Sequence, residues 1–299
     1  MRATGEDFDL RRFARLAAAL LQGMTRQGVS SRASGHHVGR GLEFHDLRDY
    51  VPGDDIRRID WRQSARRQRA VVRRFRDESA GDWFLIVDCS ASVKWGRQKW
   101  PMIVQLSSAL AYSLLFAGHR VALILFDDRV RGICRLGRSA SHYATILKTI
   151  SSHESHGIAA HDRRESVIVR SNLGLCRPYL KQSSNAFIIS DFLQADGMAS
   201  DLASVVAAVS SVNALQVLDE HEVDIPATST AELRDVETGE RRPVYLSSES
   251  VARAREVLDA HGQRLRHACN GLGIRFTACT TAENWERVLL DHLQARMSR

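Results

Sequence analysis

Long apolar runs are missing from this chain of 299 residues. No run approaches the roughly 20 residues that a membrane-spanning helix needs. The apolar segment 16–21 is too short for that role, and it lacks the cleavage pattern of a signal peptide. We therefore expect no transmembrane segment. The hydrophobic share of 44% and the charged share of 26% are typical of a globular protein with a large core.

Paired cysteines are missing as well. The five cysteines are odd in number, scattered and never in C-x-x-C spacing, which argues against a disulfide framework and a zinc site: Cys89, Cys134, Cys176, Cys269 and Cys279. Reduced cysteines are typical of the cytosol, so we expect a cytoplasmic location.

Familiar catalytic and nucleotide-binding motifs are also lacking. The chain contains no G-x-x-x-x-G-K-[ST] loop and no G-x-G-x-x-G after a predicted strand, so it has no nucleotide machinery of its own. It contains no G-x-S-x-G nucleophile elbow and no H-E-x-x-H zinc motif. These absences favour a binding role over an enzymatic one.

Lysine is missing from residues 1–80, which hold 17 Arg against 11 Asp plus Glu and so carry +6 of the net charge of +7. Nine of these arginines lie within Arg57–Arg76, where Asp60 is the one acidic residue. Such a stripe is suited to nucleic acid or an anionic surface. Against this, only Trp61 and Phe75 are available to stack on bases, and arginine also serves ion pairs at protein interfaces. We favour the structural or protein-interface use and keep nucleic acid as the alternative.

Strands and helices alternate from Trp83 onward with short connections. Continuous apolar strands separated by helices predict a doubly wound, mostly parallel α/β sheet covered on both faces. We expect strands at 83–88, 121–126, 130–136 (an edge strand), 186–190, 212–218 and 274–277, and helices at 8–24, 99–117, 141–150, 172–183, 198–210, 248–269 and 283–296. A β-hairpin insertion is expected at about 221–246. We divide the chain into an N-terminal helix with a basic, arginine-rich extension (1–80) and the α/β domain (81–299).

The first strand of this domain ends in a D-x-S-x-S loop. Its Asp88, Ser90 and Ser92 follow the buried run Phe84–Val87 at the carboxyl edge of the predicted sheet, where α/β proteins place their ligand sites. A carboxylate and two hydroxyls can converge there on a hard cation such as Mg²⁺, which prefers oxygen ligands. The alternative is that these residues cap the next helix.

Two further positions are candidates to complete such a site. Asp191 follows the apolar strand 186–190, in the same arrangement as Asp88, and Ser171 precedes the predicted helix 172–183. Together they predict a cation site of Asp88, Ser90, Ser92, Ser171 and Asp191 for Mg²⁺ or Mn²⁺.

This order of strand, D-x-S-x-S, helix, hydroxyl loop and strand-Asp resembles the metal-ion-dependent adhesion site of von Willebrand factor A domains, whose fold is Rossmann-like. The resemblance implies a site that binds a partner's carboxylate and performs no chemistry. This chain departs from the family where Ser171 replaces a Thr and Val93 replaces a frequent Met. Lys94 lies close enough in sequence to compete with a cation.

A second resemblance covers the segment upstream of the site. Residues 41–66 contain G-L-E-F-H-D-L-R-D-Y-V-P-G-D-D-I-R-R-I-D-W-R-Q-S-A-R, which is similar to the signature of the bacterial family of unknown function numbered fifty-eight. The resemblance implies a von Willebrand A-like domain after the signature, and a MoxR-type AAA+ ATPase as the partner that the protein serves as an adaptor.

The residues of this segment also have a physical interpretation. Acidic and basic side chains alternate around a Gly-Asp-Asp turn and a predicted Ile-Asp-Trp strand, which suits a network of charge-assisted hydrogen bonds. The network either clamps the N-terminal segment or forms a partner interface, because Arg, Tyr and Trp are enriched in interfaces. The candidate interaction residues are Arg48, Tyr50, Asp54, Asp55, Arg57, Asp60, Trp61 and Arg66.

Taken together, the residues predict a non-enzymatic module that captures an acidic group of a protein partner through a Mg²⁺-dependent site. A metal-dependent hydrolase with Asp88 as nucleophile is disfavoured, since such chemistry usually needs a second carboxylate where this chain has Ser90. Cys89 is expected to be a packing residue rather than a nucleophile.

Overall fold

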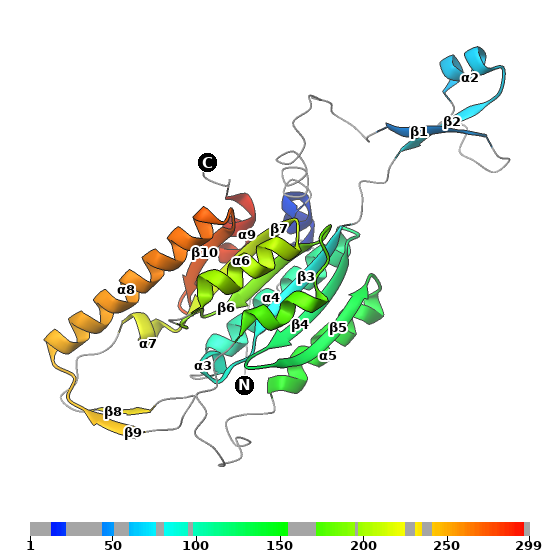
Figure 1. Cartoon of the computed structure of the whole chain (residues 1–299). Coiled ribbons are helices and arrows are strands. Elements are labelled where there is room, and N and C mark those ends of the chain that lie inside the picture. The colour runs from blue at the N-terminus through cyan, green and yellow to red at the C-terminus, as the bar shows by residue number, and fades with distance from the viewer. Residues whose placement is uncertain are drawn as a thin grey trace. The chain divides into compact units, whose positions relative to one another are not determined.

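The computed structural model describes residues 13–21, 44–50, 60–75, 81–94, 98–154, 172–194, 197–224, 231–234 and 241–295. Its chain divides into two compact units, one formed by Met1–Ser30 with Gly81–Arg299 and the other by Ser31–Ala80. Each unit is described by itself below, and Figure 1 labels their elements.

The larger unit is built on a six-stranded sheet of order β10-β7-β6-β3-β4-β5. All neighbouring strands are parallel except the edge pair β4 and β5, which is antiparallel. The chain therefore has the mixed α/β fold, with a mostly parallel sheet, that its alternating pattern predicts. The strands are β3 (Asp82–Asp88), β4 (Arg120–Phe126), β5 (Val130–Gly137), β6 (Asn185–Ser190), β7 (Ser211–Leu218) and β10 (Arg275–Thr280).

Helices cover both faces of this sheet (Figure 1). Alternate side chains of β3 enter two separate cores, with Leu85 and Val87 in one and Phe84 and Ile86 in the other. The first core includes residues of α4 (Lys99–Phe116), α5 (Ala140–Glu154) and α9 (Trp285–Gln294). The second includes residues of η3 (Leu173–Tyr179), α6 (Met198–Ala208) and α8 (Ser248–Gly271). Burial on both faces explains why the central strands are continuously apolar.

The N-terminal helical segment 13–21 belongs to the larger unit. Phe13 and Leu21 are buried in the core beside α4 and α9, and the Phe13 ring meets the Trp285 ring edge to face at 5.4 Å. The division at residue 80, which grouped this helix with the arginine-rich segment, therefore differs from the structure. The physical reason is that the helix has an apolar face, which it buries against the sheet unit.

The smaller unit contains the antiparallel pair β1 (Phe44–Asp49) and β2 (Val71–Phe75), with α2 (Trp61–Arg67) between them. Asp60 and Trp61, the described part of the predicted Ile-Asp-Trp strand, are not in a strand. Asp60 instead caps the N-terminus of α2 by accepting hydrogen bonds from the amides of Arg62 and Gln63. An aspartate at this position satisfies helix amides that would otherwise lack a partner.

The predicted insertion lies between β7 and α8. It contains α7 (Glu220–Val223) and the antiparallel hairpin of β8 (Ala231–Arg234) and β9 (Arg241–Val244). One further prediction was wrong, because the helix expected at 172–183 is a short 3-10 helix, η3. It contains Pro178, which cannot donate the hydrogen bond that an α-helix requires.

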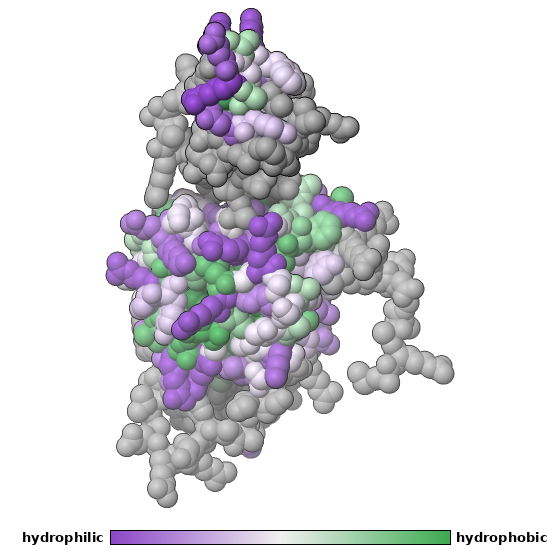
Figure 2. Space-filling model, turned by 90° about the vertical axis from the view of Figure 1, so that its right-hand side faces the viewer, coloured by the Kyte–Doolittle hydropathy of each residue, from purple (hydrophilic) through white to green (hydrophobic). Residues whose placement is uncertain are grey.

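Strand β5 is the edge strand that the sequence predicts. Exposed Arg135 and Arg138 flank its end, and Ile133 is exposed on it. Figure 2 views the side where β5 and α5 lie, and it shows hydrophilic residues interspersed among hydrophobic ones. Such charges discourage pairing with another strand. Within the described residues, none of the helices combines the length and the hydropathy required to cross a membrane.

Candidate functional site

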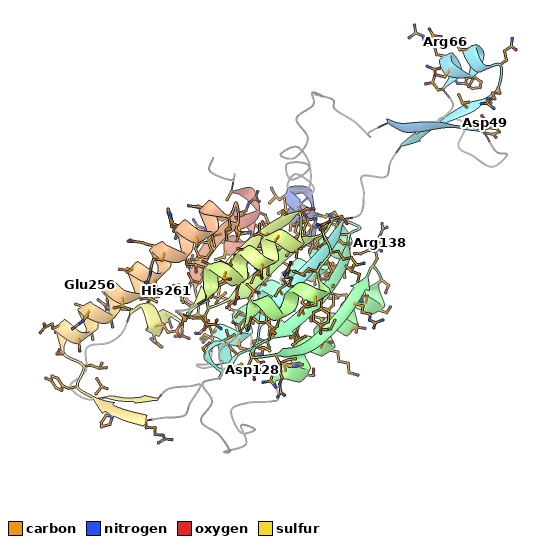
Figure 3. The ribbon with its side chains drawn as sticks, in the orientation of Figure 1. Asp49, Arg66, Asp128, Arg138, Glu256 and His261 are labelled. Carbon is orange, nitrogen blue, oxygen red and sulfur yellow. The ribbon has the colours of Figure 1, made fainter. Side chains whose placement is uncertain are left out.

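The site is at the carboxyl edge of the sheet, where β3 and β6 end side by side. After β3 the chain continues through β4 and β5 on one side, and it returns to form β6, β7 and β10 on the other. The carboxyl edge between β3 and β6 is thus the point where the strand order reverses, which is the usual ligand position in such folds. We call this position the Asp88 crevice. Asp128, at the same end of the sheet as α3 (Ala91–Lys94), and Arg138, at the opposite end, are labelled in Figure 3.

Asp88 ends β3 and is almost completely buried, with 2% exposure. One of its carboxylate oxygens accepts a hydrogen bond from the Ser90 amide at 2.9 Å, and the other accepts one from the Ser190 hydroxyl at 2.6 Å. The second bond joins the ends of β3 and β6. These contacts hold the Asp88 carboxylate in one orientation at the crevice.

The D-x-S-x-S segment adds two hydroxyls next to the end of β3. The Oγ atoms of Ser90 and Ser92 are 3.1 Å apart, and Ser90 is buried. Ser92 is in α3 together with Val93, which is fully buried and anchors this short helix in the core. The structure therefore brings Asp88, Ser90 and Ser92 together, as their spacing predicts.

Asp191 follows β6 and contacts a cation that the sequence analysis did not identify. Its Oδ2 lies 3.1 Å from the ammonium of Lys99, which is the first residue of α4 and is fully buried. The same ammonium lies 2.7 Å from Oε1 of Glu222 in α7. We call this set of Lys99, Asp191 and Glu222 the Lys99 bridge. No pattern around Lys99 marks it as a site residue, because only the tertiary fold brings it to the two carboxylates.

The residue after Asp191 has an unusual backbone. Phe192 is buried and has a φ of +50°, a left-handed conformation that non-glycine residues rarely adopt. Its amide donates to the Ser190 hydroxyl at 2.9 Å, and its carbonyl accepts from Nε2 of His261 on α8 at 2.6 Å. His261 is labelled in Figure 3. Strained backbone of this kind clusters at functional sites, where the surrounding contacts maintain it.

Electrostatics distinguish Asp88 from an ordinary carboxylate. Burial, and secondarily the negative charge of Asp191, raise the pKa of Asp88 to about 6, although hydrogen bonds from Ser190 and Ser90 oppose the shift. Burial likewise raises the pKa of the Cys89 thiol to about 12, which favours its protonated form. Lys94 lies over the Trp100 ring at 5.5 Å, and Lys99 is instead the buried cation of the site.

The donor set fits a hard divalent cation, because carboxylate and hydroxyl oxygens from Asp88, Ser90 and Ser92 meet at one edge. Asp191 is the exception, since its carboxylate is already paired with Lys99. Within the described residues, no group of three or more His, Cys, Asp or Glu side chains is gathered for a metal ion. A cation here would depend on few carboxylates and several hydroxyls. The predicted ligand Ser171 lies outside the described residues.

The candidate interaction residues of the smaller unit divide into two kinds. Asp60 is buried, and its backbone pairs with Val71, so it holds α2 against β2 within the unit. Trp61, by contrast, is 68% exposed, and Arg66 is exposed in the same helix. Tyr50 is partly exposed, and its amide donates to Ala70. Arg48 lies on β1, and Asp54, Asp55 and Arg57 lie outside the described residues.

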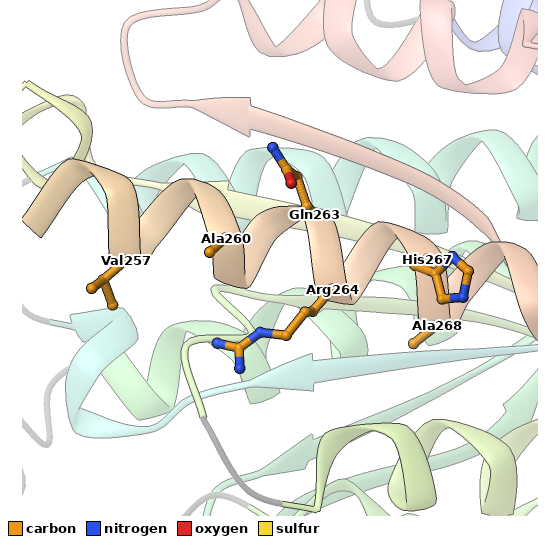
Figure 4. Close-up of a pocket in the computed structure, with 6 residues that line it drawn as sticks. All are labelled: Val257, Ala260, Gln263, Arg264, His267 and Ala268. Atoms are coloured by element: carbon orange, nitrogen blue, oxygen red, sulfur yellow. The ribbon is translucent and has the colours of Figure 1, made fainter. Parts of the chain in front are cut away.

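A pocket away from this edge lies along the exposed face of α8 (Figure 4). One helix supplies all of its lining residues: Val257, Ala260, Gln263, Arg264, His267 and Ala268. It contains no carboxylate, and it is separate from the Asp88 crevice.

Three solved structures are similar to this chain at 12–15% identity. They are the conserved hypothetical protein BatB from Bacteroides thetaiotaomicron (TM-score 0.44, covering 71% of this chain and 97% of that one), an aerotolerance-related membrane protein from Bacteroides fragilis (0.39, 70% and 94%) and an uncharacterized membrane-spanning protein from Vibrio fischeri (0.23, 68% and 92%). These scores are too low to support an argument about function.

The expected cytoplasmic location is corrected by this comparison. Two of the three neighbours are described as membrane proteins, which points away from the cytoplasm, although these descriptions belong to those proteins. The physical reason for the error is that free cysteines report a reducing environment and not attachment to a membrane.

Sequence comparison identifies relatives that cover nearly the whole chain. Two mycobacterial proteins are each 30% identical to this chain over 286 residues, which is 91% of this chain and 86% of theirs. They are uncharacterized protein Rv1480 of Mycobacterium tuberculosis and uncharacterized protein Mb1516 of Mycobacterium bovis. The family model described as "Protein of unknown function DUF58" matches residues 46–266, well over half of the chain. The chain belongs to the DUF58 family.

Proposed function

We propose that this protein is a non-enzymatic interaction module that captures an acidic side chain of a partner protein at the Asp88 crevice with the help of Mg²⁺. The observation that carries the proposal is the convergence of Asp88, Ser90, Ser190 and Asp191 on one crevice, where both carboxylates are buried. The order of these elements resembles von Willebrand factor A domains and supports the same function. The family resemblance favours a MoxR-type AAA+ ATPase as the partner.

Each residue has a role that follows from its contacts. A bound Mg²⁺ would supply the positive charge that attracts a partner's carboxylate, with Mn²⁺ as a substitute. Asp88, Ser90 and Ser92 would hold it through their oxygens. Ser190 orients Asp88, and Lys99 neutralises Asp191, so the crevice does not repel an acidic ligand as strongly as two free carboxylates would.

The site chemistry favours binding over catalysis. Ser90 stands where a hydrolase with Asp88 as nucleophile would need its second carboxylate. Cys89, the thiol nearest to the site in sequence, is held protonated by burial. Neither group supplies a nucleophile with an adjacent base.

The proposal is tested by thermal unfolding in EDTA and in millimolar Mg²⁺ or Mn²⁺, with wild type, Asp88→Asn and the control Ser210→Ala. Asparagine keeps the acceptor for the Ser90 amide and removes the charge, while Ser210 contacts Gln182 away from the crevice. A ligand at a hundred times its dissociation constant stabilises by about 2.7 kcal/mol, which raises Tm by a few degrees. We expect this rise in wild type and in Ser210→Ala, but not in Asp88→Asn. An equal rise in all three proteins, or in none, would refute the metal site.

A second candidate function is the binding of nucleic acid or another anionic surface through the arginine-rich segment. It is favoured by α2, where Trp61, Arg62 and Arg66 are all exposed. Binding through these arginines would weaken steeply with salt and would not respond to EDTA, whereas capture at the Asp88 crevice would be abolished by EDTA.

A further inference from the structure

The Lys99 bridge places a carboxylate of the protein itself, that of Glu222, at the edge of the sheet where the proposed function requires a carboxylate of the partner. Its three side chains differ sharply in exposure: Lys99 is 0%, Asp191 4% and Glu222 29% exposed. Solvent therefore reaches the bridge mainly at Glu222.

The charges of the bridge make Lys99 dependent on a carboxylate. Burial by itself lowers the pKa of Lys99, but the charges of Asp191 and Glu222 outweigh it and hold that pKa above its ordinary value. A buried ammonium that loses a partner is strongly destabilised unless another anion replaces it. Glu222 can therefore leave at low cost only when another carboxylate takes its place.

The helix that carries Glu222 is weakly attached to the rest of the unit. α7 has four residues, and none of them is buried. Besides the bridge, it is held by polar contacts, including the bond from the Glu220 amide to Thr281 at 3.0 Å and the ion pair of Asp224 with Arg255. Segments with few buried apolar contacts and exposed hydrogen bonds open locally at low free energy.

We propose that Glu222 is an internal substitute for the partner's acidic side chain, and that a glutamate or aspartate of the partner binds Lys99 by displacing Glu222 and releasing α7. This inference rests on the proposed function. It adds Lys99 to the site as a second cation, beside the proposed Mg²⁺. The contact of Glu222 with Lys99 opposes binding of the partner until the partner displaces it. Because one carboxylate replaces another, Lys99 stays paired throughout. Release of α7 also moves the start of the insertion that contains β8 and β9.

The contact is tested with Glu222→Gln and the matched control Glu220→Gln. The Asp219 amide donates a hydrogen bond to Oε2 of Glu222 at 2.9 Å. Glutamine at position 222 keeps an oxygen for this bond and removes the charge that pairs with Lys99. Glu220→Gln removes the same charge from the same helix, but Oε1 of Glu220 lies 4.0 Å from Nε2 of His221 and is not part of the Lys99 bridge.

The probe is a fluorescein-labelled hexaglutamate peptide in millimolar Mg²⁺, with a hexaglutamine peptide as the negative control. Fluorescence anisotropy gives its affinity, and hydrogen exchange of residues 218–224 reports the release of α7. If α7 is closed in at least nine molecules out of ten, Glu222→Gln binds the peptide at least about tenfold more tightly than wild type or Glu220→Gln. In wild type, the peptide also speeds exchange in α7.

The outcomes separate this inference from the proposed function. Peptide binding to wild type with unchanged exchange in α7, or no gain in affinity in Glu222→Gln, would overturn the displacement of Glu222 and leave acidic capture in place. If hexaglutamate binds none of the three proteins, acidic capture fails and this inference fails with it.

Discussion

Two buried carboxylates at one edge of the sheet are stabilised in different ways. Asp88 accepts hydrogen bonds from neutral donors, the Ser90 amide and the Ser190 hydroxyl, and burial together with the charge of Asp191 raises its pKa to about 6. Asp191 is paired with the ammonium of Lys99. A carboxylate held by neutral donors is the better place for an additional cation, and this is why the proposed metal site is centred on Asp88.

At this scale we predict that Lys99→Met strongly destabilises the protein. Methionine fills a similar volume but leaves Asp191 buried without its ion pair, which costs about 3–5 kcal/mol when one partner of a buried pair is removed. Urea unfolding measures the loss. Lys148→Met, at an exposed position, is the control and should change the free energy of unfolding by less than about 0.5 kcal/mol. Equal effects of the two substitutions would mean that the bridge does not contribute to stability.

The residues of the site were predictable to different degrees. Asp88, Ser90, Ser92 and Asp191 could be found because they follow buried strands whose carboxyl ends must meet. Ser190 could have been found by the same rule, as it ends its strand. Lys99 and Glu222 could not be found from the sequence, since their roles depend on the packing of α4 and α7 at that edge and not on any local pattern. The sequence analysis therefore missed Ser190, Lys99 and Glu222.

Among the elements, the strands and long helices follow their sequence patterns closely, and the shorter segments do not. β3 is buried at all seven positions and was predicted within a residue of its observed start. The helix expected at 172–183 failed because Pro178 interrupts it, leaving η3. Short segments depend on single residues and on their neighbours in space, so their periodicity alone is a weak guide.

At the scale of elements, the contact of α9 with β10 predicts a pH dependence. His292 of α9 is fully buried, and its Nδ1 lies 2.8 Å from the Thr277 hydroxyl on β10. Burial, with a smaller effect from the charge of Arg275, lowers the pKa of His292 to about 3, against about 6.5 in an unfolded chain. Between these values the unfolded state binds the proton and the native state does not, so stability present above pH 6.5 is lost as pH falls towards 3.

We expect the free energy of unfolding, measured in urea at pH 7.5, 6 and 5, to fall more steeply with acidification in wild type than in His292→Gln. His267→Gln, at an exposed histidine of α8, should keep the steep wild-type slope. Parallel slopes for wild type and His292→Gln would contradict the lowered pKa of His292.

On the scale of the whole molecule, the chain forms two units, and the larger one is built from two separate stretches of sequence, Met1–Ser30 and Gly81–Arg299. The helical segment 13–21 packs in the core of the sheet unit, although residues 31–80 separate it in sequence from that unit. Its apolar face is complemented by α4 and α9. Residues of β1, α2 and β2 make their own contacts within the smaller unit.

This arrangement predicts that Phe13→Ala destabilises the sheet unit. Phe13 is 4% exposed and contacts the ring of Trp285, so its truncation leaves a cavity and costs about 3–5 kcal/mol. Chemical unfolding followed by tryptophan fluorescence measures the loss. Leu16→Ala, in the same helix but 53% exposed, is the control and should have little effect. A small effect of Phe13→Ala would mean that the helix does not contribute to the core.

The sequence by itself determined the α/β class, the order of most strands and helices, and the D-x-S-x-S carboxylate at the end of β3. It did so because burial on both faces requires continuous apolar strands, and because parallel strands bring their carboxyl ends to one edge. The tertiary structure alone decided that the N-terminal helix joins the sheet unit, and that Asp191 is paired with Lys99 and Glu222. These contacts depend on side chains that meet only after packing, since a buried ammonium is stable only where the fold brings carboxylates to it.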